Sequence, residues 1–436
     1  MKYVSTRGGT QPTSLSDAIA AGLAPDGGLY VPQTLPRFVP DDFAGRESLA
    51  DIAARLLAPF FAGDALESEL PAICAEACTF AAPLQPLATA NDFVLELFHG
   101  PTAAFKDFGV RFLAACMRRI PRASSQPLTI LVATSGDTGA AVGAAFAGLS
   151  GFRVAILYPD GRVSPRQAHQ LGCFGGNVHA LRVAGSFDDC QRLVKQALSD
   201  ACLREGNPLG SANSISLGRL LPQMAYYAQA ALSHHRARGE TLNFVVPTGN
   251  LGNALAGMLA RAAGLPIGRI ALATNANRTL PDFFAGDDYR PRDSIATLAN
   301  AMDVGAPSNF ERLRWLYPDA DTLRHEFSVE AIDDAAIRAT IRDRHARFGE
   351  VFCPHTATAI RMLETMRAKG VSGDWCTVAT AHPAKFEGIV EPLIGQPVTV
   401  PPALAELLAR PTHSQPLATD YAALSGFLES DAPEQV

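Results

Sequence analysis

The sequence predicts an α/β protein with open, mostly parallel sheets and helices on both sheet faces. Two observations support this prediction. Short apolar runs alternate with helical stretches of about 10–15 residues through the middle of the chain, which is typical of βαβ units. In addition, 47% of the 436 residues are hydrophobic and only 18% are charged, which indicates a folded chain with a large core.

Six apolar runs are predicted strands, and four stretches between them are predicted helices. The predicted strands span residues 128–134, 153–159, 178–183, 242–249, 269–275 and 375–381. The predicted helices span residues 140–149, 164–174, 187–203 and 249–264. Ser164 and Pro165 mark the start of the second helix, because serine is a favoured N-cap and proline is favoured at the first helical position.

The pattern divides the chain into three predicted parts. Residues 1–80 are rich in helices and loops and are expected to form a separate N-terminal layer. Residues 81–400 hold the α/β body, in which the segment 276–330 is irregular and has no assigned element. Residues 401–436 are rich in proline and alanine, and we expect an appended helix with a frayed end.

Charge and composition exclude several classes of protein. A net charge of −6 with scattered signs gives no basic patch for nucleic acid. The sequence contains no run of about 18 apolar residues, so no membrane-spanning helix is predicted. The start of the chain, MKYVSTRGGTQPT, has no apolar core of a signal peptide, so a cytoplasmic protein is expected. The cysteine and histidine spacings match no metal motif, so no metal is predicted.

Lysine is rare in this chain, and one lysine lies in an apolar loop. Only five of the 37 basic residues are lysines, and Lys106 lies in FHGPTAAFKDFG (98–109). A lysine amine with a lowered pKa can form an imine, whereas arginine cannot. Lys106 is therefore a candidate imine lysine. The alternative is a lysine whose stem packs while its head reaches solvent.

Three turns rich in small residues follow predicted strands, where open α/β sheets bind ligands. ATSGDTGAA (133–141) offers N–H groups and hydroxyls for a carboxylate or phosphate, although taken in isolation an ordinary N-cap by Ser135, Asp137 or Thr138 is the better explanation. PTGNLGNALAG (247–257) precedes a helix and suits one terminal phosphate better than a pyrophosphate. TAHPAKFE (380–387) places a hydroxyl, that of Thr380, where it can pair with a ring nitrogen without protonating it.

The third turn also contains Lys385, a rival imine lysine. Lys385 lies near Glu387 in sequence, so we expect a solvated salt bridge between them. A phosphate cradle, a candidate imine lysine and a polar partner for a ring nitrogen together predict pyridoxal phosphate as the cofactor.

Eight motifs, in order along the chain, resemble those of the threonine synthase family, and most closely its subgroup with an extended N-terminal region. The motifs are YVSTRGG (3–9), GLAPDGGLYVP (22–32), FHGPTAAFKDFG (98–109), ATSGDTGAAV (133–142), SANSIS with GRLLPQ (211–223), PTGNLGN (247–253), NAMDVGAPSN (300–309) and ATAHPAKF (379–386). The combination of HGPT, AFKD, SGDTG and TAHPAKF is highly specific.

The resemblance implies a pyridoxal-phosphate-dependent lyase of fold type II, with two α/β lobes and the cofactor between them. The smaller lobe would span about residues 100–190. The implied reaction converts O-phospho-L-homoserine and water to L-threonine and phosphate by γ-elimination and β-addition of water, the last step of threonine biosynthesis. A monomer or homodimer is expected.

The resemblance also implies roles for individual residues. Lys106 would be the catalytic lysine and would hold the cofactor as an imine, and Thr380 would pair with the pyridine nitrogen. The backbone of a phosphate cradle would bind the cofactor phosphate: Gly249, Asn250, Leu251, Gly252 and Asn253. The substrate would be bound by Thr134, Ser135, Gly136, Asp137 and Thr138, and its phosphate by Asn213, Ser214 and Arg219. Two positions depart from the family pattern: Ser216 replaces an asparagine, and Leu251 replaces an aromatic residue.

Three alternatives to this activity remain open. One is another fold type II lyase, such as a serine/threonine dehydratase or a phospholyase, which would lack a dedicated phosphate site or add no water. The others are a non-catalytic sensor that keeps the cofactor fold, and a simple phosphate-binding module. The presence of Lys106 argues against the last two.

Overall fold

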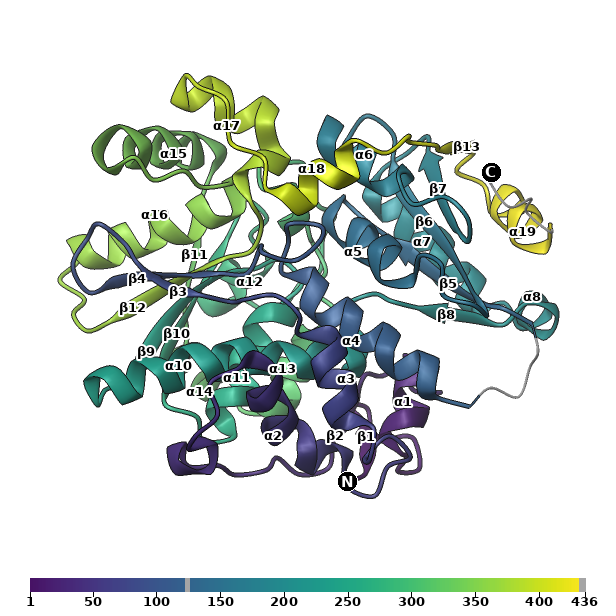
Figure 1. Ribbon diagram of the computed structural model, residues 1–436, viewed down its shortest axis with the longest axis horizontal. Helices are drawn as coiled ribbons and strands as arrows, with labels where there is room; N and C mark the ends of the chain where they lie inside the picture. The colour runs from purple at the N-terminus through teal and green to yellow at the C-terminus, as the bar shows by residue number, and fades with distance from the viewer. Residues whose placement is uncertain (122–125, 431–436) are drawn as a thin grey trace.

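Two sheet-containing lobes lie side by side in the computed structural model, which describes residues 1–121 and 126–430 (Figure 1). One sheet has six strands in the order β11-β10-β9-β12-β4-β3, and the other has five in the order β13-β7-β6-β5-β8. Neighbouring strands are parallel in both sheets except for β3 against β4. The predicted α/β class with parallel sheets is confirmed.

The six-stranded sheet contains three predicted strands and three that the sequence analysis missed. The predicted ones are β9 (Leu242–Pro247), β10 (Ile267–Thr274) and β12 (Trp375–Ala379). The missed ones are β3 (Leu84–Pro86), β4 (Asp92–Glu96) and β11 (Ser328–Ala331). Helices α10 (Met224–Arg238) and α11 (Gly252–Ala262) cover one face, while α15 (Asp334–Phe348) and α16 (Pro354–Ala368) lie over the other (Figure 1).

The five-stranded sheet extends beyond the smaller lobe expected at about residues 100–190. Its central strands were predicted, whereas β8 and the edge strand β13 were not. The strands are β5 (Leu128–Ala133), β6 (Phe152–Pro159), β7 (Val178–Val183), β8 (Leu209–Ser211) and β13 (Gln415–Leu417). The helices of this lobe are α4 (Lys106–Arg119), α5 (Asp137–Phe146), α6 (Pro165–Gly172), α7 (Phe187–Ser199) and α8 (Ala201–Gly206).

Capping side chains set two helix boundaries in this lobe. Ser164 caps α6 as predicted, because its hydroxyl accepts from the backbone N–H of Gln167, whose side chain bonds back. The predicted helix 187–203 is instead two helices. The side chain of Asp200 accepts from the N–H of Leu203, which starts α8 and ends the run of α7.

The N-terminal region packs into the body and has no separate core. Its elements are β1 (Tyr3–Ser5), α1 (Leu15–Ala21), β2 (Tyr30–Pro32), η1 (Pro40–Phe43), α2 (Leu49–Phe61) and α3 (Leu70–Ala77). Buried residues of α2 belong to the same hydrophobic cluster as those of α4 and α10. The ring of Phe61, for example, meets that of Phe112 edge-on at 6.1 Å. The expected separate layer therefore shares its core with the α/β body.

The segment 276–330, which had no assigned element, contains several short ones. They are α12 (Thr279–Phe284), η3 (Asn300–Met302), α13 (Phe310–Leu316), α14 (Ala320–Glu326) and the start of β11. Earlier in the chain, the short elements α9 (Leu217–Leu220) and η2 (Leu221–Gln223) lead into α10. Their shortness explains why no periodic pattern marked them.

The C-terminal extension is more structured than expected. After η4 (Pro383–Phe386) and α17 (Glu387–Ile394) come α18 (Pro402–Leu408), β13 and α19 (Tyr421–Glu429). The strand pairs with β7, and α19 packs beside α7, so this extension completes the five-stranded lobe (Figure 1). The frayed end expected for the last residues, 431–436, lies outside the described residues. No helix in the described part of the chain is both long and apolar enough to span a bilayer.

Candidate active site

The loop that precedes Lys106 meets the turn that begins at Thr380 at the junction between the lobes. Strands β4 and β12 are parallel neighbours, so the chain segments that follow them leave the sheet at the same edge. The loop after β4 then pairs with the turn after β12: Ala104 and Ala381 form an antiparallel bridge, and the N–H of Phe105 donates to the carbonyl of Thr380 at 2.8 Å. Thr380 itself is buried, with 7% of its surface exposed.

Lys106 is the first residue of α4 and has an amine that is easily deprotonated. Burial lowers its pKa to about 8. The carboxylate of Asp137 opposes this shift, whereas the positive charges of Arg219 and Lys385 add to it. An amine with such a pKa can act as a nucleophile and can exchange protons near neutral pH.

The SGDTG turn (135–139) connects β5 to α5, and the side chain of the preceding residue, Thr134, holds it closed. The hydroxyl of Thr134 accepts from the N–H groups of Gly136 and Gly139, both at 3.0 Å. Gly136 has φ 129°, a conformation that favours glycine. Ser135 and Thr138 are half-buried. The Thr134 hydroxyl therefore fixes the turn, while the turn itself lies at the start of α5.

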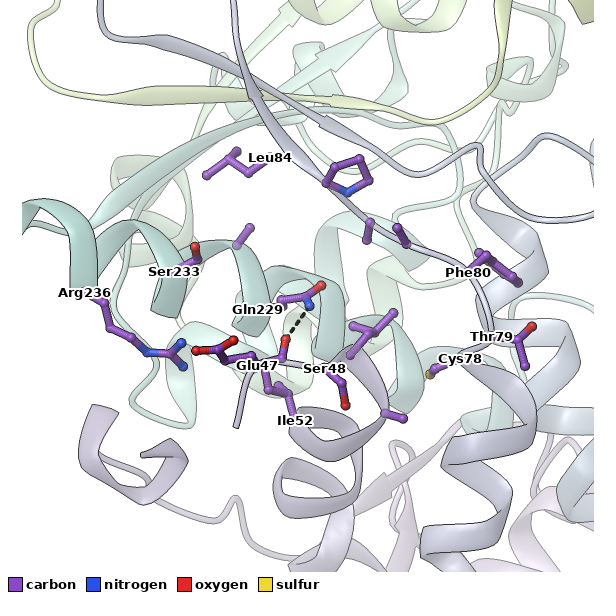
Figure 2. A pocket seen from close by; sticks show the side chains of 16 residues that line it. Glu47, Ser48, Ile52, Cys78, Thr79, Phe80, Leu84, Gln229, Ser233 and Arg236 are labelled. Atoms are coloured by element: carbon purple, nitrogen blue, oxygen red, sulfur yellow. Dashed lines mark hydrogen bonds between the residues drawn. The ribbon is translucent and has the colours of Figure 1, made fainter. Parts of the chain in front are cut away.

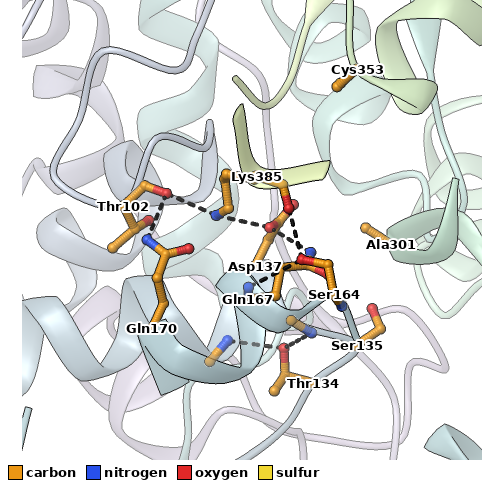
Figure 3. A network of polar contacts seen from close by, with 12 residues as sticks. Thr102, Thr134, Ser135, Asp137, Ser164, Gln167, Gln170, Ala301, Cys353 and Lys385 are labelled. Carbon is orange, nitrogen blue, oxygen red and sulfur yellow. Dashed lines mark hydrogen bonds and ion pairs between the residues drawn. The ribbon is translucent and has the colours of Figure 1, made fainter. Parts of the chain in front are cut away.

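Lys385 is buried, and the expected solvated salt bridge with Glu387 is wrong. Its side chain is fully buried, and its Nζ lies 2.9 Å from Oδ1 of Asp137 and donates to the carbonyl of Thr102 at 2.8 Å (Figure 3). Glu387 instead lies 3.9 Å from Nε of Arg166. The turn η4 directs Lys385 toward the five-stranded lobe, which proximity in sequence to Glu387 could not indicate.

The charge of Asp137 is stabilised by this arrangement. Burial raises the pKa of its carboxyl, but Lys385 and Lys106 lower it more, so the net pKa lies well below the ordinary value. Nε2 of Gln167 also donates to Oδ1 of Asp137 at 3.0 Å. Asp137 is therefore an ionised partner of Lys385 at neutral pH.

The phosphate cradle, residues 249–253, exposes backbone at the start of α11. A Cβ on Gly249 would lie 2.8 Å from Cα of Met302, so only glycine fits there. Leu251 has φ 63° and precedes the first residue of this 11-residue helix, whose leading N–H groups suit an anion. Oδ1 of Asn253 accepts from the hydroxyls of Tyr226 and Tyr227, which anchors the cradle from behind.

The predicted substrate-phosphate residues adjoin the cradle. Nδ2 of Asn250 donates to Oγ of Ser214 at 2.5 Å, and Asn213 is half-buried next to it. Asn309 ties the two segments together, because its Nδ2 donates to the carbonyls of Ser214 at 3.3 Å and Asn250 at 3.1 Å. The hydroxyl of Ser216, the departure from the family pattern, is buried with no hydrogen-bond partner among the described residues.

The guanidinium of Arg219 is buried and has no carboxylate partner in the described part of the chain. Only 3% of its surface is exposed, and burial lowers its pKa to about 10. Its Nη1 donates to the carbonyl of Ala212 at 2.7 Å, while its Nε has no partner within the described residues. A Cβ on Gly109 would lie 2.7 Å from the Arg219 carbonyl, so glycine lets α4 approach α9 closely. This packing brings Arg219 near Lys106.

Two groups that the sequence analysis missed support the SGDTG turn. Nδ2 of Asn300 donates to the carbonyl of Ser135 at 3.3 Å and to Oε1 of Gln167 at 3.2 Å. Nε2 of His355 accepts from the N–H of Ala301 at 3.0 Å. Burial lowers the pKa of His355 to about 4, so its imidazole is neutral. Asn300 and Ala301 lie in the NAMDVGAPSN motif, whereas nothing in the sequence indicated His355.

Arg312 was also missed, and it joins three segments. It is 1% exposed, and burial lowers its pKa to about 9. Its Nε donates to the carbonyl of Tyr30, its Nη1 to Oδ1 of Asn309 and its Nη2 to the carbonyl of Ile215. One side chain therefore connects the N-terminal β2, the loop before α13 and the segment that contains Ser214.

These residues fit pyridoxal phosphate. Lys106 offers an amine of lowered pKa, and the cradle offers backbone N–H groups at a helix start, where the absence of a side chain on Gly249 lets the backbone pack against Met302. The Arg219 guanidinium has no carboxylate partner among the described residues and its Nε makes no hydrogen bond there, so it needs an anion, which a second phosphate would supply. An aldehyde-bearing phosphate and a phosphorylated substrate match this donor set.

A large cavity lies away from the predicted site residues, and the described residues contain no candidate metal site. This cavity, of about 700 Å³, lies between α2, the segment 78–84 and α10, and none of the predicted site residues lines it (Figure 2). In residues 1–121 and 126–430, no group of three His, Cys, Asp or Glu side chains could hold a metal ion.

The sequence matches three family descriptions. Residues 82–383 match "Pyridoxal-phosphate dependent enzyme", residues 2–78 match "Threonine synthase N terminus", and residues 356–428 match "Threonine synthase, C-terminal". Together these matches cover most of the chain. The N-terminal match lies outside the six-stranded and five-stranded sheets, whereas the C-terminal match includes β12 and β13.

Individual proteins match over nearly the whole length. The threonine synthase of Serratia marcescens is 40% identical over 436 residues, covering 98% of this chain and 99% of that protein. The crystal structure of threonine synthase from Escherichia coli superposes with a TM-score of 0.90 at 38% identity, covering 98% of this chain and 99% of that one. The pyridoxal-phosphate-bound threonine synthase from Brucella melitensis gives 0.88 at 36% identity, covering 98% of each chain.

Proposed function

Because this chain belongs to the threonine synthase family, we propose that its substrate is O-phospho-L-homoserine, which it converts with water to L-threonine and phosphate. The family is one of fold type II lyases that use pyridoxal phosphate, so the predicted fold type, enzyme class, cofactor and threonine synthase activity are confirmed. The identity of the substrate and the roles of the individual residues are our proposals.

The observation that carries the substrate proposal is the unpaired Arg219. A buried guanidinium that has no carboxylate partner among the described residues is costly unless an anion binds there. The cradle at α11 can take the cofactor phosphate, which leaves Arg219, Asn213 and Ser214 for a second phosphate. A dehydratase acting on free serine or threonine would need no second phosphate site.

Lys106 is the proposed proton carrier. When bound, the cofactor supplies an electron-accepting ring that stabilises negative charge on the substrate carbon next to the amine. The neutral Lys106 amine can take the proton from Cα and can move protons at Cβ and Cγ. Burial and neighbouring cations keep its pKa near 8, so a neutral fraction exists at physiological pH.

The other proposed roles follow from the same arrangement. Arg219 balances the charge of the phosphate that leaves Cγ, because a charge-assisted contact strengthens as that charge develops. The hydroxyl of Thr380 would pair with the ring nitrogen without protonating it. Residues 134–138 would bind the amino-acid end of the substrate through the turn at the start of α5. Water then adds at Cβ to give the threonine hydroxyl.

A product assay tests the substrate proposal. The purified enzyme with its cofactor is given O-phospho-L-homoserine, and threonine, 2-oxobutanoate and phosphate are measured. Equal amounts of threonine and phosphate with little 2-oxobutanoate are expected. A phospholyase or dehydratase would release 2-oxobutanoate as the main product. Parallel assays with serine and threonine distinguish a dehydratase, since these substrates carry no phosphate for Arg219.

The division into parts is also a proposal. Residues 1–80, 81–400 and 401–436 would be an N-terminal region, the catalytic body and a C-terminal extension. The family matches at residues 2–78 and 82–383 support the first boundary, whereas the C-terminal match begins at residue 356, inside the proposed body. We also propose a cytoplasmic monomer or homodimer that acts on a small molecule and binds no nucleic acid. Light scattering after size-exclusion chromatography measures the oligomeric state.

A further inference from the structure

Lys385 and Asp137 form a buried ion pair between the two lobes. Lys385 belongs to η4, which follows the six-stranded sheet, whereas Asp137 starts α5 in the five-stranded lobe. Their charged atoms lie 2.9 Å apart, with 0% and 4% of the side chains exposed. A buried pair offsets its desolvation cost only when its remaining hydrogen bonds are made. Here Gln167 donates to Asp137 and Thr102 accepts from Lys385 (Figure 3).

The pair is joined to the loop that carries Lys106. The carbonyl of Thr102, which Lys385 binds, lies four positions before Lys106 in the sequence. The N–H and hydroxyl of Thr102 in turn donate to Asp107, at 2.8 Å and 2.7 Å. Lys385 therefore fixes both the carboxylate of the SGDTG turn and the start of α4. Neither contact belongs to the roles proposed above.

The charges that act on Lys106 come from three elements. Asp137 of α5 contributes the negative charge, and Arg219 of α9 and Lys385 of η4 contribute positive charges. His355 of α16 is neutral, because burial lowers its pKa to about 4. The Asp137 carboxylate therefore interacts with both lysines, but its direct ion pair, at 2.9 Å, is with Lys385.

We propose that Lys385 is a positioning residue that holds the Asp137 carboxylate on itself, so that the Lys106 amine stays neutral enough to attach the cofactor. The proposal rests on the assignment of Lys106 above. Attachment joins the neutral amine nitrogen to the aldehyde carbon, and the aldehyde oxygen leaves as water. A protonated amine has no free electron pair and cannot take this step. Without Lys385, Asp137 would pair with Lys106 and keep it protonated.

The test measures attachment to the full-length enzyme after its cofactor is removed. Pyridoxal phosphate is added over a pH series, borohydride fixes the adduct after a short time, and the Lys106 peptide is quantified. The free cofactor titrates in the same way in every sample. A difference between variants in the pH midpoint of attachment therefore comes from the protein. Removing an opposite or like charge a few ångströms away shifts a pKa by about one unit or more. Lys385→Met should therefore raise the midpoint by about one pH unit.

Asp137→Asn should move the midpoint in the opposite direction, because it removes the negative charge while the cations stay. The double variant Lys385→Met/Asp137→Asn should lie between the two single variants. Lys369→Met is the matched control, since Lys369 is exposed at the end of α16 and should leave the midpoint unchanged. If Lys385→Met does not fold alone, the double variant decides. Because Lys385 acts through Asp137, the midpoint of the double variant should lie close to that of Asp137→Asn, and a rise of a full pH unit above it would show that Lys385 acts without Asp137.

The outcomes separate the proposal from the assignment beneath it. Midpoints that shift in the same direction for both single variants, or that do not shift in folded variants, would overturn the role of Lys385. An adduct found on Lys385 instead of Lys106 in the unmodified enzyme would overturn the assignment of Lys106. Circular dichroism on each sample establishes that the variants are folded.

Discussion

The backbone N–H of Phe105 donates to the carbonyl of Thr380 at 2.8 Å. These residues are far apart in sequence, and their bond places the lysine at the start of α4 beside the turn that follows β12. It also explains why HGPT–AFKD and TAHPAKF occur in one chain: the two motifs form a single backbone structure. Each of the following predictions tests one part of the site around this contact.

Lys106→Ala should abolish both covalent attachment of the cofactor and threonine formation. The other buried lysine of the site, Lys385, is already bound to Asp137 and to the carbonyl of Thr102. Borohydride treatment followed by mass spectrometry of the intact protein and its peptides measures attachment. Lys369→Ala is the control and should retain full attachment. Residual cofactor fixed at Lys385 in the Lys106→Ala protein would contradict the assignment of the catalytic lysine.

Arg219→Ala should retain the attached cofactor but lose activity toward O-phospho-L-homoserine. The loss of one desolvated, charge-assisted contact costs roughly 2–4 kcal/mol, or about 30- to 1000-fold in kcat/KM. Arg290→Ala is the control, because that side chain is 78% exposed. Steady-state kinetics together with the absorbance of the attached cofactor measure the effect. Release of the cofactor from the variant would show that Arg219 binds the cofactor phosphate instead of the substrate phosphate.

Thr380→Asp should damage activity far more than Thr380→Ser. The serine keeps a neutral hydroxyl at a position that is 7% exposed, whereas aspartate buries a carboxylate that favours a protonated ring nitrogen. We expect a loss of about 100-fold or more for aspartate, which is ~3 kcal/mol, and less than about 10-fold for serine. Rates of threonine formation give the comparison. Equal rates for the two variants would refute the neutral pairing.

Arg312→Met should weaken both stability and substrate binding. It leaves the buried carbonyls of Tyr30 and Ile215 and the amide oxygen of Asn309 without their donor, at roughly 1–3 kcal/mol for each group that stays unsatisfied. Because Asn309 and Ile215 hold the Ser214 segment, KM should rise about tenfold or more. Urea unfolding and kinetics measure the two effects. Arg312→Lys should recover part of the stability, and an unchanged KM in a folded Arg312→Met protein would argue against the positioning role.

Asp303 should make stability fall as pH rises from about 4 to about 7. Burial raises the pKa of this carboxyl to about 7, although Thr297 and Asn275 donate to it. A carboxyl whose folded-state pKa is raised binds its proton more tightly when folded, so its contribution is complete below about pH 4 and is lost as pH approaches 7. Asp303→Asn should flatten this dependence in urea unfolding between pH 5 and pH 8. Asp321→Asn, at an 81% exposed site, should not.

Much of the site could be predicted because its residues lie in local turns. Three features with local physical causes predicted the candidate site. They are the glycine at 249, the small-residue turns after three of the strands, and a lysine in a chain that otherwise uses arginine. These features indicated the cradle, the SGDTG turn and Lys106. The N-cap at Ser164 also depends on a few adjacent residues, and it is present. The motifs then indicated the family, which the full-length matches confirmed.

The sequence by itself determined the fold class, the central strands, the family and the candidate lysine, because alternating patterns and turn residues act over a few neighbouring positions. Only the tertiary structure decided which charges meet. Lys385 is near Glu387 in sequence but pairs with Asp137 from the other lobe, and Arg312 joins three segments through carbonyl groups that no sequence pattern marks. The physical reason is that the pKa of a buried group depends on desolvation and on charges brought close by packing, and packing joins residues that are distant along the chain.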